Sequence, residues 1–252
     1  MIYGLYLSAS GVLTNSYRQD VIANNIANAE TVGFKKDLTL LQARPTAAQQ
    51  LGRPRETDPT LEPIGGELFS ARPVVDSRPG DIETTGNNMD VALQGQGFLA
   101  VSSNGTTHLT RNGQFMIDRS NRLVLSNNPN EAVLDYKQNP IVLDSALPPT
   151  FAVDGTITQN GKSVGRLGLF TVKNPSNLQK AGGTLLTLPA GANLQQATPM
   201  VRDGFVERSN VDPAVELTEL MDTQRQLEAN ANMIHIQDET LDKLVNDVGR
   251  VS

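Results

Sequence analysis

Heptad periodicity at both ends of the chain is the feature that most restricts its fold. Near the C-terminus, residues recur in alternating steps of three and four, which places them on one seam of a long helix. The seam comprises Leu217, Leu220, Gln224, Leu227, Ala231, Ile234, Asp238, Leu241, Val245 and Val248. Asp212 can cap this helix, and Pro213 suits its first position because the missing N–H needs no partner there. Since neither Gly nor Pro occurs in residues 214–248, one uninterrupted helix is predicted.

A second and weaker heptad stripe occupies the N-terminal segment. Its members are Leu5, Ser8, Val12, Asn15, Gln19, Ile22 and Ile26. Gly4 and Gly11 each lower the helix propensity by about 1 kcal/mol relative to Ala, so this helix is expected to need a partner. Val32-Gly33 is predicted to end it, because Gly supplies the backbone freedom that a chain reversal requires.

The middle of the chain has a different character. In residues 39–67, four X-Pro pairs interrupt a polar stretch and favour extended backbone. Residues 69–202 contain short apolar or alternating runs, such as 89–93, 122–125 and 167–172, which are typical of strands. The turn dipeptides Asn104-Gly105, Asn112-Gly113, Asp154-Gly155 and Asn160-Gly161 are predicted to form two-residue hairpin loops, in which both central positions need positive φ.

These patterns together predict an α+β fold. The N- and C-terminal helices pair as a coiled coil, a central β domain is mostly antiparallel, and an extended Pro-rich arm links the parts. The expected domains are a helical domain of residues 1–34 and 205–252, a linker arm of residues 35–68, and a β-rich domain of residues 69–204. The pattern alone leaves two interpretations open: the helices assemble with other copies, or they brace the β domain of a monomer.

Composition argues against several classes of protein. Cysteine is absent, which excludes disulfides, thiolate zinc sites and cysteine nucleophiles. The formal net charge is −6, and scattered Lys and Arg residues do not form the basic footprint of a nucleic-acid binder. No apolar run reaches the roughly 18 residues of a membrane span. The N-terminus lacks the basic start and small-residue cleavage site of a secretory signal, so an exported chain would need another route.

Side chains able to carry catalysis do not form a recognisable constellation. His108 and His235 are the only histidines, and they fall in different predicted elements, so a shared metal site is not expected. The pair Gly95 and Gly97 lacks the Gly-Lys-Ser/Thr ending of a phosphate-binding loop, and nothing resembles a nucleophile elbow. The sequence therefore predicts a protein that is not an enzyme and that has neither cofactor nor metal.

Four segments resemble the motifs of the bacterial flagellar basal-body rod and hook family. They are residues 22–29 followed by 31–35 (IANNIANA, TVGFK), residues 90–98 (DVALQGQGF), residues 109–118 (beginning LTRNGQF), and residues 204–212 (GFVERSNVD). Their order is similar to that of the family over nearly the whole chain. Two departures concern the choice of subfamily: Leu227 stands where related chains often carry Tyr, and Asn121 where Gly is common.

The resemblance implies a structural subunit of the flagellar rod, with the proximal rod type favoured and the distal type next. Such a subunit polymerises into a helical tube, the drive shaft that transmits torque from motor to hook. The resemblance also implies export through the flagellar type III apparatus without a cleaved signal, and a basal-body rod that spans the periplasm. The implied partners are copies of the chain and other axial proteins, without nucleic acid and without membrane insertion.

Residues expected at contacts between subunits come from the helix seams and from the first and fourth motifs. They are Leu5, Val12, Asn15, Gln19, Ile22, Asn24, Asn25, Ile26, Asn28, Gly33, Phe34, Ser209, Asn210, Val211, Leu217, Leu220, Met221, Gln224, Arg225, Leu227, Ile234 and Leu241. Three alternatives to the proximal rod subunit stay open. One is a distal rod or hook-type subunit, one is an extracytoplasmic glycan-binding protein or enzyme with a helical brace, and one is a coiled-coil adaptor that forms a closed oligomer.

Overall fold

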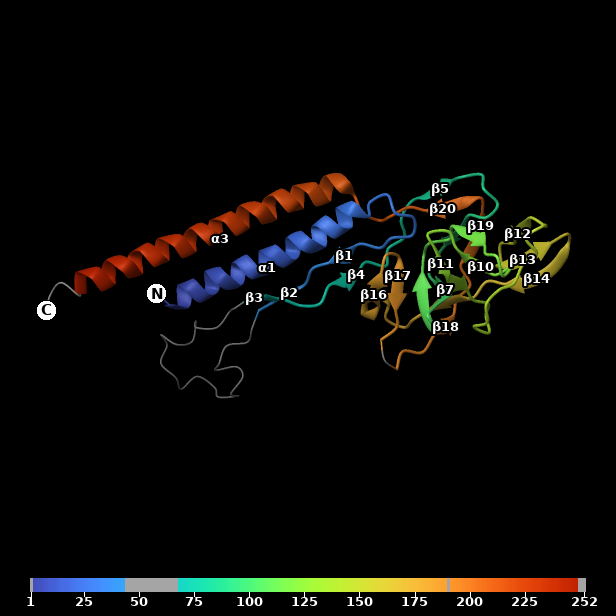
Figure 1. Ribbon diagram of the computed structural model, residues 1–252, viewed down its shortest axis with the longest axis horizontal. Helices are drawn as coiled ribbons and strands as arrows, with labels where there is room; N and C mark the ends of the chain where they lie inside the picture. The colour runs from blue at the N-terminus through green and yellow to red at the C-terminus, as the bar shows by residue number, and fades with distance from the viewer. Residues whose placement is uncertain (1, 44–67, 190, 249–252) are drawn as a thin grey trace. The chain divides into compact units, whose positions relative to one another are not determined.

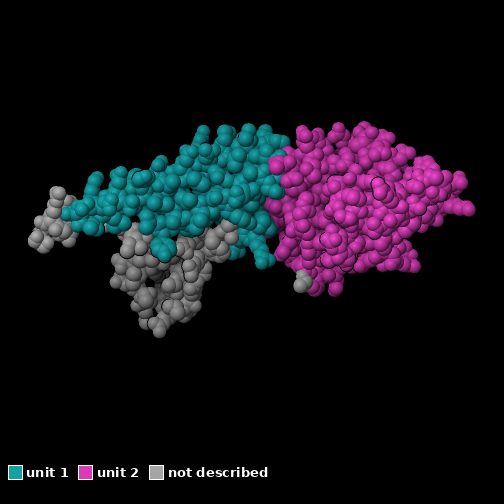
Figure 2. All heavy atoms as spheres, in the orientation of Figure 1, with its two compact units in different colours: residues 1–26, 38–73, 213–252 teal, residues 27–37, 74–212 magenta. Residues whose placement is uncertain are grey.

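The computed structural model describes residues 2–43, 68–189 and 191–248 and divides the chain into two compact units. The helical unit consists of residues 1–26, 38–73 and 213–252, and the β unit consists of residues 27–37 and 74–212 (Figure 2). Two long helices and a mostly antiparallel set of strands make the chain α+β, which confirms the predicted class at that level. Residues 44–67, which form most of the expected Pro-rich arm, lie outside the described residues.

Both predicted helices are present in the helical unit. Helix α1 (Ile2–Ala27) has 26 residues, and helix α3 (Pro213–Val248) has 36 and begins at the predicted proline (Figure 1). Helix α1 ends before the predicted Val32-Gly33 stop, and Gly33 instead adopts a φ of 71° in the β unit. A short antiparallel hairpin in the helical unit joins β2 (Leu41–Ala43) to β3 (Leu68–Ser70).

A nine-stranded sheet forms the main part of the β unit, and its paired strands are antiparallel. Its order is β16-β17-β8-β7-β11-β10-β9, with β15 paired to both β7 and β18. The strands are β7 (Phe98–Ser103), β8 (Thr106–Thr110), β9 (Phe115–Ile117), β10 (Leu123–Leu125), β11 (Asn128–Val133), β15 (Leu169–Thr171), β16 (Gln179–Gly182), β17 (Leu185–Thr187) and β18 (Gln195–Gln196). Strand β7 is central because it pairs with three others, β8, β11 and β15.

Smaller sheets complete the β unit. One has the order β12 (Pro149–Phe151), β13 (Thr156–Gln159) and β14 (Lys162–Arg166), and two more join β19 (Met200–Asp203) to β6 (Val91–Gln94) and β20 (Phe205–Glu207) to β5 (Ile82–Thr84). The short strands β1 (Asp37–Leu38) and β4 (Val74–Val75) occur where the chain passes from one unit to the other, and η1 (Pro175–Asn177) is a single 3₁₀ turn. Consequently, strands from the C-terminal part of the unit complete sheets begun by β5 and β6.

The core of the β unit is built from aliphatic side chains. Leu99, Leu123, Leu125 and Ile157 are completely buried in its larger apolar cluster, and a second cluster gathers around Phe98, Leu109 and Phe170. Aromatic contacts are few among the described residues; one joins Phe115 and Phe151, whose ring centroids lie 5.9 Å apart. Most of the buried apolar side chains of the β unit therefore come from its strands.

Two of the four predicted hairpin turns are confirmed. Asn104-Gly105 joins β7 to β8 and Asn160-Gly161 joins β13 to β14, and all four of these residues have positive φ. In Asp154-Gly155 only the glycine has positive φ, because the connection between β12 and β13 is longer than two residues.

The hairpin predicted at Asn112-Gly113 is wrong. Neither residue has positive φ, and strands β8 and β9 on either side of the pair are not neighbours in the sheet. A Cβ added at Gly113 would overlap the carbonyl of Val91, whose own N–H donates to the Gly113 carbonyl at 2.9 Å. The glycine thus permits a close approach of two backbones rather than a turn.

Candidate functional site

Helix α3 turns a heptad face toward α1, but this face differs from the predicted seam at every second position. Its less exposed residues are Glu216, Leu220, Thr223, Leu227, Asn230, Ile234, Gln237 and Leu241. The four apolar members belong to the predicted seam. Polar residues take the alternate positions, each one residue before the predicted Leu217, Gln224, Ala231 and Asp238, which are exposed. Val245 is also exposed, and the side chain of Val248 lies outside the described ones.

Helix α1 shows a matching pattern on the face toward α3. The residues with the heptad spacing are Gly4, Ser8, Gly11, Asn15, Arg18, Ile22 and Asn25, all of them buried or half-buried. Ser8, Asn15 and Ile22 belong to the predicted seam, whereas Leu5, Val12, Gln19 and Ile26 are half-buried beside it. The facing surface of α1 is therefore made of small and polar side chains, with Ile22 as the one large aliphatic among these seven positions.

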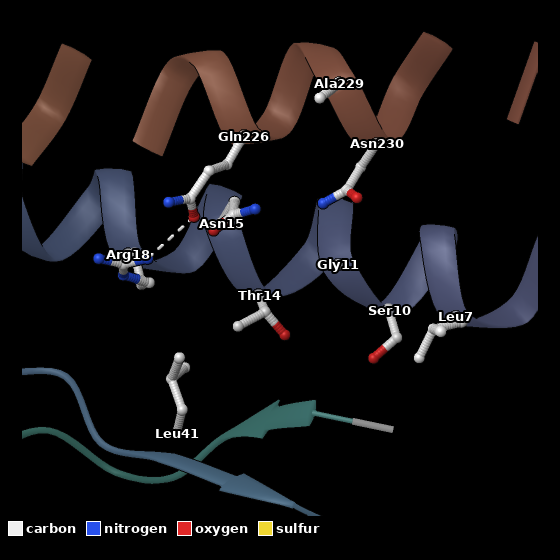
Figure 3. A pocket seen from close by; sticks show the side chains of 10 residues that line it. All are labelled: Leu7, Ser10, Gly11, Thr14, Asn15, Arg18, Leu41, Gln226, Ala229 and Asn230. Carbon is white, nitrogen blue, oxygen red and sulfur yellow. Dashed lines mark hydrogen bonds between the residues drawn. The ribbon is translucent and has the colours of Figure 1, made fainter. Parts of the chain in front are cut away.

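Contacts between the two helices follow one antiparallel order. Asn25 Nδ2 donates to Glu216 Oε2 at 3.2 Å, and both residues are 2% exposed. Arg18 Nη1 donates to Gln226 Oε1 at 3.3 Å, as the dashed line in Figure 3 shows. Because the partners move toward the C-terminus of α3 as one moves toward the N-terminus of α1, the helices run in opposite directions.

The two glycines of α1 each face an amide side chain of α3. A Cβ placed on Gly11 would lie 2.5 Å from Nδ2 of Asn230, and one placed on Gly4 would lie 2.8 Å from Nε2 of Gln237. Real Cβ atoms do not approach so closely, so the absence of a side chain makes room for the amide at each position. Figure 3 shows Asn230 directed from α3 toward the backbone of α1 at Gly11.

A cavity of about 430 Å³ opens beside the contact between Gly11 and Asn230. It is lined by Leu7, Ser10, Gly11, Thr14, Asn15, Arg18, Leu41, Gln226, Ala229 and Asn230 (Figure 3). All of these residues belong to the helical unit, and Leu41 comes from β2. The cavity is thus bounded by both helices and the hairpin, and much of its lining is apolar.

Large apolar side chains lie on the outward faces of the helices. On α1, Tyr6 and Leu13 are exposed, the latter to 73%. On α3, the exposed set comprises Val215, Leu217, Met221, Met233, Ile236, Leu244 and Val245. The helix pair consequently encloses polar and small groups together with Ile22 and the four aliphatic residues on the inner face of α3, and it leaves other large aliphatic groups outside. Large apolar side chains left exposed on both helices are candidates for contact with another chain.

The β unit contains a buried ion cluster centred on Glu207. Arg111 Nη1 donates to Glu207 Oε2 at 2.7 Å, while Lys35 Nζ binds Oε1 of the same carboxylate. The three side chains are at most 3% exposed. Burial lowers the pKa of Lys35 below its ordinary value, an effect that the charge and hydrogen bond of Glu207 oppose. The cluster brings two cations to one anion, so backbone oxygens must help to hold the excess charge.

Backbone groups from separate segments complete this cluster. Arg111 donates to the carbonyls of Leu93 at 3.1 Å and Gly95 at 2.6 Å, and Lys35 donates to that of Arg78 at 2.7 Å. The N–H of Gly33 donates to the carbonyl of Glu207 at 2.7 Å. All four segments that carried the family resemblance therefore meet at one buried site.

A second polar contact set surrounds Asn210. Its Oδ1 accepts from the N–H of Lys36 at 2.8 Å, and its Nδ2 donates to the carbonyls of Asp76 and Arg78, both at 3.1 Å. Arg78 also binds the Asp76 carboxylate, with Nη2 2.6 Å from Oδ2, and this hydrogen bonding lowers the pKa of Asp76. The segment that follows α1 and the segment that precedes α3 are thereby tied to each other within the β unit.

Residues predicted at subunit contacts fall into four groups, and the first is the half-buried set beside the inner face of α1: Leu5, Val12, Gln19 and Ile26. Those in the β unit (Asn28, Gly33, Phe34, Ser209, Asn210 and Val211) are buried or half-buried, and Phe34 lies under Lys180, whose Nζ is 3.6 Å from the ring centroid. Those on the inner helix faces (Asn15, Ile22, Asn25, Leu220, Leu227, Ile234 and Leu241) contribute to the helix pair. Asn24, Leu217, Met221, Gln224 and Arg225 are exposed. A role for any of them between subunits stays a prediction.

Sequence reasoning missed the charged residues of the cluster and the polar layers of the helix pair. Lys35, Arg111 and Glu207 each lie inside one of the family-like motifs, so the motifs held the signal although the residues were not singled out. In the described ranges, the structure shows no group of three His, Asp or Glu side chains arranged to hold a metal ion. No described helix is both long and apolar enough to cross a membrane.

Comparisons with known proteins agree along the chain. Family models match at residues 5–35 (flagella basal body rod protein), 92–164 (flagellar hook protein FlgE/F/G D1 domain) and 202–247 (flagellar basal body rod FlgEFG protein C-terminal). The chain is 31% identical to the flagellar basal-body rod protein FlgF of Caulobacter vibrioides over 98% of both chains. It is also 31% identical to the rod protein FlgG of Buchnera aphidicola subsp. Schizaphis graminum, covering 97% of this chain and 99% of the relative. Identity to the hook-basal body complex protein FlhP of Bacillus subtilis is 30%, over 96% of this chain and 98% of the relative.

Proposed function

The chain belongs to the family of bacterial flagellar basal-body rod proteins, and we propose that it polymerises with other copies and other axial subunits into the tubular shaft that transmits torque from motor to hook. As a member of this family it is a structural subunit of the rod. FlgF-named and FlgG-named relatives match at the same 31% identity, so that number does not separate the two. The chain length and the single modest β domain favour a rod subunit over a hook-type subunit. Among rod subunits the proximal type is our first choice, and the distal type is the alternative.

The outward apolar faces of α1 and α3 are the observation that carries this proposal. Leu13 on α1 and Leu217 and Met221 on α3 are exposed, although side chains of this size gain about 1.5–3 kcal/mol each from full burial. The inner face of α1 offers them no room, since it is occupied by the polar and glycine layers. Other copies of the chain, presenting the same faces, can cover them repeatedly along a polymer.

The α1–α3 contacts support a two-helix antiparallel coiled coil within each subunit. The heptad spacing on both helices and the Asn25–Glu216 and Arg18–Gln226 hydrogen bonds favour it. In the polymer, this coiled coil forms the inner layer of the tube and the β unit forms the outer layer. The cavity beside Gly11 then receives apolar side chains of a neighbouring copy, because its lining includes Leu7, Leu41 and Ala229.

In this proposal each domain predicted from the sequence has its own role. Residues 1–34 and 205–252 build the core of the shaft, residues 35–68 form a linking arm, and residues 69–204 form the outer domain. In the single chain the compact units divide instead after residues 26 and 212. The subunit acts in the basal body, in the rod that spans the periplasm, after delivery by the type III export apparatus without a cleaved signal. Its role is assembly and not catalysis.

Isolation of hook–basal bodies from the source bacterium tests the proposal. Mass spectrometry should find the chain in them, and immunogold label should lie along the rod, with its height separating a proximal from a distal subunit. Absence of the chain from intact basal bodies would contradict the proposal. Binding of the purified chain to cell-wall glycans would then be measured, because a glycan-binding module is the alternative from another class.

A further inference from the structure

We propose that four polar layers, and not apolar packing, set the register in which α1 and α3 pair. The inference rests on the coiled-coil pairing proposed above. The layer with both side chains almost fully buried is Asn25 with Glu216, whose side chains are joined by a 3.2 Å hydrogen bond. Proceeding in steps of seven along both helices, the next layers are Arg18 with Thr223, Gly11 with Asn230, and Gly4 with Gln237.

In each layer the residue of α1 and the residue of α3 complement each other in size and polarity. Thr223 is completely buried and sits one turn before Gln226, which accepts the hydrogen bond from Arg18. Asn230 and Gln237 lie against glycines, and a Cβ at either glycine would force the facing amide to move from its observed place. Oε1 of Gln237 is buried and has no hydrogen-bond partner among the described residues. An unsatisfied buried acceptor lowers the stability of the helix pair, so this layer contributes to the choice of register more than to the stability of the pairing.

Apolar packing cannot select the register by itself. Leu220, Leu227, Ile234 and Leu241 recur every seven residues on α3, so a shift that brings Leu227 to the place of Leu220 again presents an aliphatic side chain at each place. The opposite shift puts Pro213 in the place of Leu220. On α1, the positions between the polar layers are Ser8, Asn15 and Ile22, of which only the last is apolar. The first shift therefore changes little apolar burial, and the discrimination against it must come from the polar layers.

A shift in either direction breaks several of these layers. If α3 moves so that Gln237 faces Gly11, the amide of Asn230 meets Arg18 and loses its glycine. If α3 moves the other way, Arg18 gains Glu216, but Gln237 leaves its glycine and Asn25 loses its buried acceptor. Both shifts break the buried hydrogen bond between Asn25 and Glu216, and the loss of a hydrogen bond between buried groups is costly.

Chemical cross-linking of the full chain measures the register directly. The chain contains no cysteine, so two engineered thiols are the only ones that can react. The reporter of the observed register is R18C with Q226C, and the reporters of the two shifted registers are R18C with M233C and R18C with E219C, joined by a short bis-maleimide. Because all three reporters replace Arg18, they measure the register preference that the other three layers set. The first pair should cross-link at least about tenfold more than either other pair, since leaving one buried polar group unsatisfied costs about 1.4 kcal/mol, which corresponds to a tenfold ratio of populations.

Two sets of variants then remove and restore the layers. N25L with E216L replaces both partners by apolar groups, so the chain should keep its helical circular dichroism while shifted cross-links rise to a level comparable with the first pair. G11N should disfavour the observed register, and G11N with N230G, which exchanges the two members of the layer, should restore it. N24L with Q224L is the matched control, because both positions are exposed and the cross-linking pattern should not change.

The outcomes separate the two proposals. Equal cross-linking of all three reporters in the unchanged chain, or an unaltered preference in N25L with E216L, would overturn the register proposal and leave the helix pairing intact. Failure of the exchange variant to recover the first cross-link would also overturn it. Absence of every intramolecular cross-link would contradict the pairing itself, while incorporation into the rod is scored independently.

Discussion

The carboxylate of Glu207 accepts a hydrogen bond from the guanidinium of Arg111 at 2.7 Å. The two residues are buried in the β unit and lie 96 positions apart in the sequence. Lys35 binds the other carboxylate oxygen from the segment that follows α1. Glu207 itself lies in the segment that precedes α3. The Glu207 side chain thus connects the segment that precedes α3 with the segment that follows α1 and with the middle of the chain.

Removing the central carboxylate should strongly destabilise the β unit. E207Q leaves Lys35 and Arg111 buried without a counter-charge, and breaking such a buried pair costs about 3–5 kcal/mol in the free energy of unfolding. Urea denaturation followed by circular dichroism measures this loss. E83Q is the control, since Glu83 and Arg208 form an exposed pair at 3.6 Å whose loss should cost at most about 1 kcal/mol. Equal stabilities of the two variants would contradict the importance given to the cluster.

Gly113 should tolerate no side chain. In G113A the new Cβ overlaps the Val91 carbonyl, a backbone atom that cannot turn aside, so the unfolding free energy should fall by about 1–3 kcal/mol or more. G165A provides a matched comparison, because a Cβ at Gly165 would make only an ordinary contact of 3.8 Å with Ile141. Stability measurements on both variants should therefore separate. If G113A were as stable as G165A, the backbones at Gly113 and Val91 would not approach each other as closely as described.

The Asp76–Arg78 pair should make stability sensitive to acid. Hydrogen bonds from Arg78 lower the pKa of Asp76 below its ordinary value of 3.8. The folded chain therefore binds fewer protons there than the unfolded chain, so the contribution is complete above pH 3.8 and is lost as the pH falls through the folded-state pKa. The stability difference between the unchanged chain and D76N should shrink in that acidic window, and R78Q should show the same behaviour. A difference that stays constant down to pH 2 would count against the pair.

The buried Asn25–Glu216 hydrogen bond should not tolerate a second carboxylate. N25D keeps the size of the side chain but replaces the donor by a like charge, so helix stability at neutral pH should fall by about 1–3 kcal/mol or more. Thermal unfolding monitored at the helical circular-dichroism band gives the size of the effect, and lowering the pH toward 4 should reverse part of it. N24D, at the neighbouring exposed position, should have a much smaller effect.

The sequence predicted the two long helices and the mostly antiparallel β domain correctly, because these depend on periodicity and on helix and turn signals. Pro213 begins α3 as expected, and the Asn104-Gly105 and Asn160-Gly161 turns have the positive φ values that their residues favour. Prediction failed where the partner of a residue decides its role. Asn112-Gly113 has turn chemistry, but the Val91 backbone beside it requires a glycine for another reason.

The helix seam illustrates the same limit. An apolar periodicity search favours Leu217 and Ala231, whereas the structure buries their polar predecessors Glu216 and Asn230 against Asn25 and Gly11. The outward position of Leu217 becomes intelligible only when other copies are considered. Similarly, the charged side chains of the Glu207 cluster look like surface residues in sequence, because the carbonyls that solvate them come from distant segments.

In the proposed assembly, other subunits cover the outward apolar residues of α3 when the rod forms. Incorporation of L217S with M221S into the rod, measured by mass spectrometry of hook–basal bodies from cells that express only this variant, tests it most directly. Both side chains are about half exposed in the single chain, so its folding and thermal stability should change little, whereas incorporation should fall severely. N232S, at an exposed position of the same helix that is not expected at a subunit contact, should incorporate normally. Full incorporation of the double variant would contradict the claim that these faces hold the polymer together.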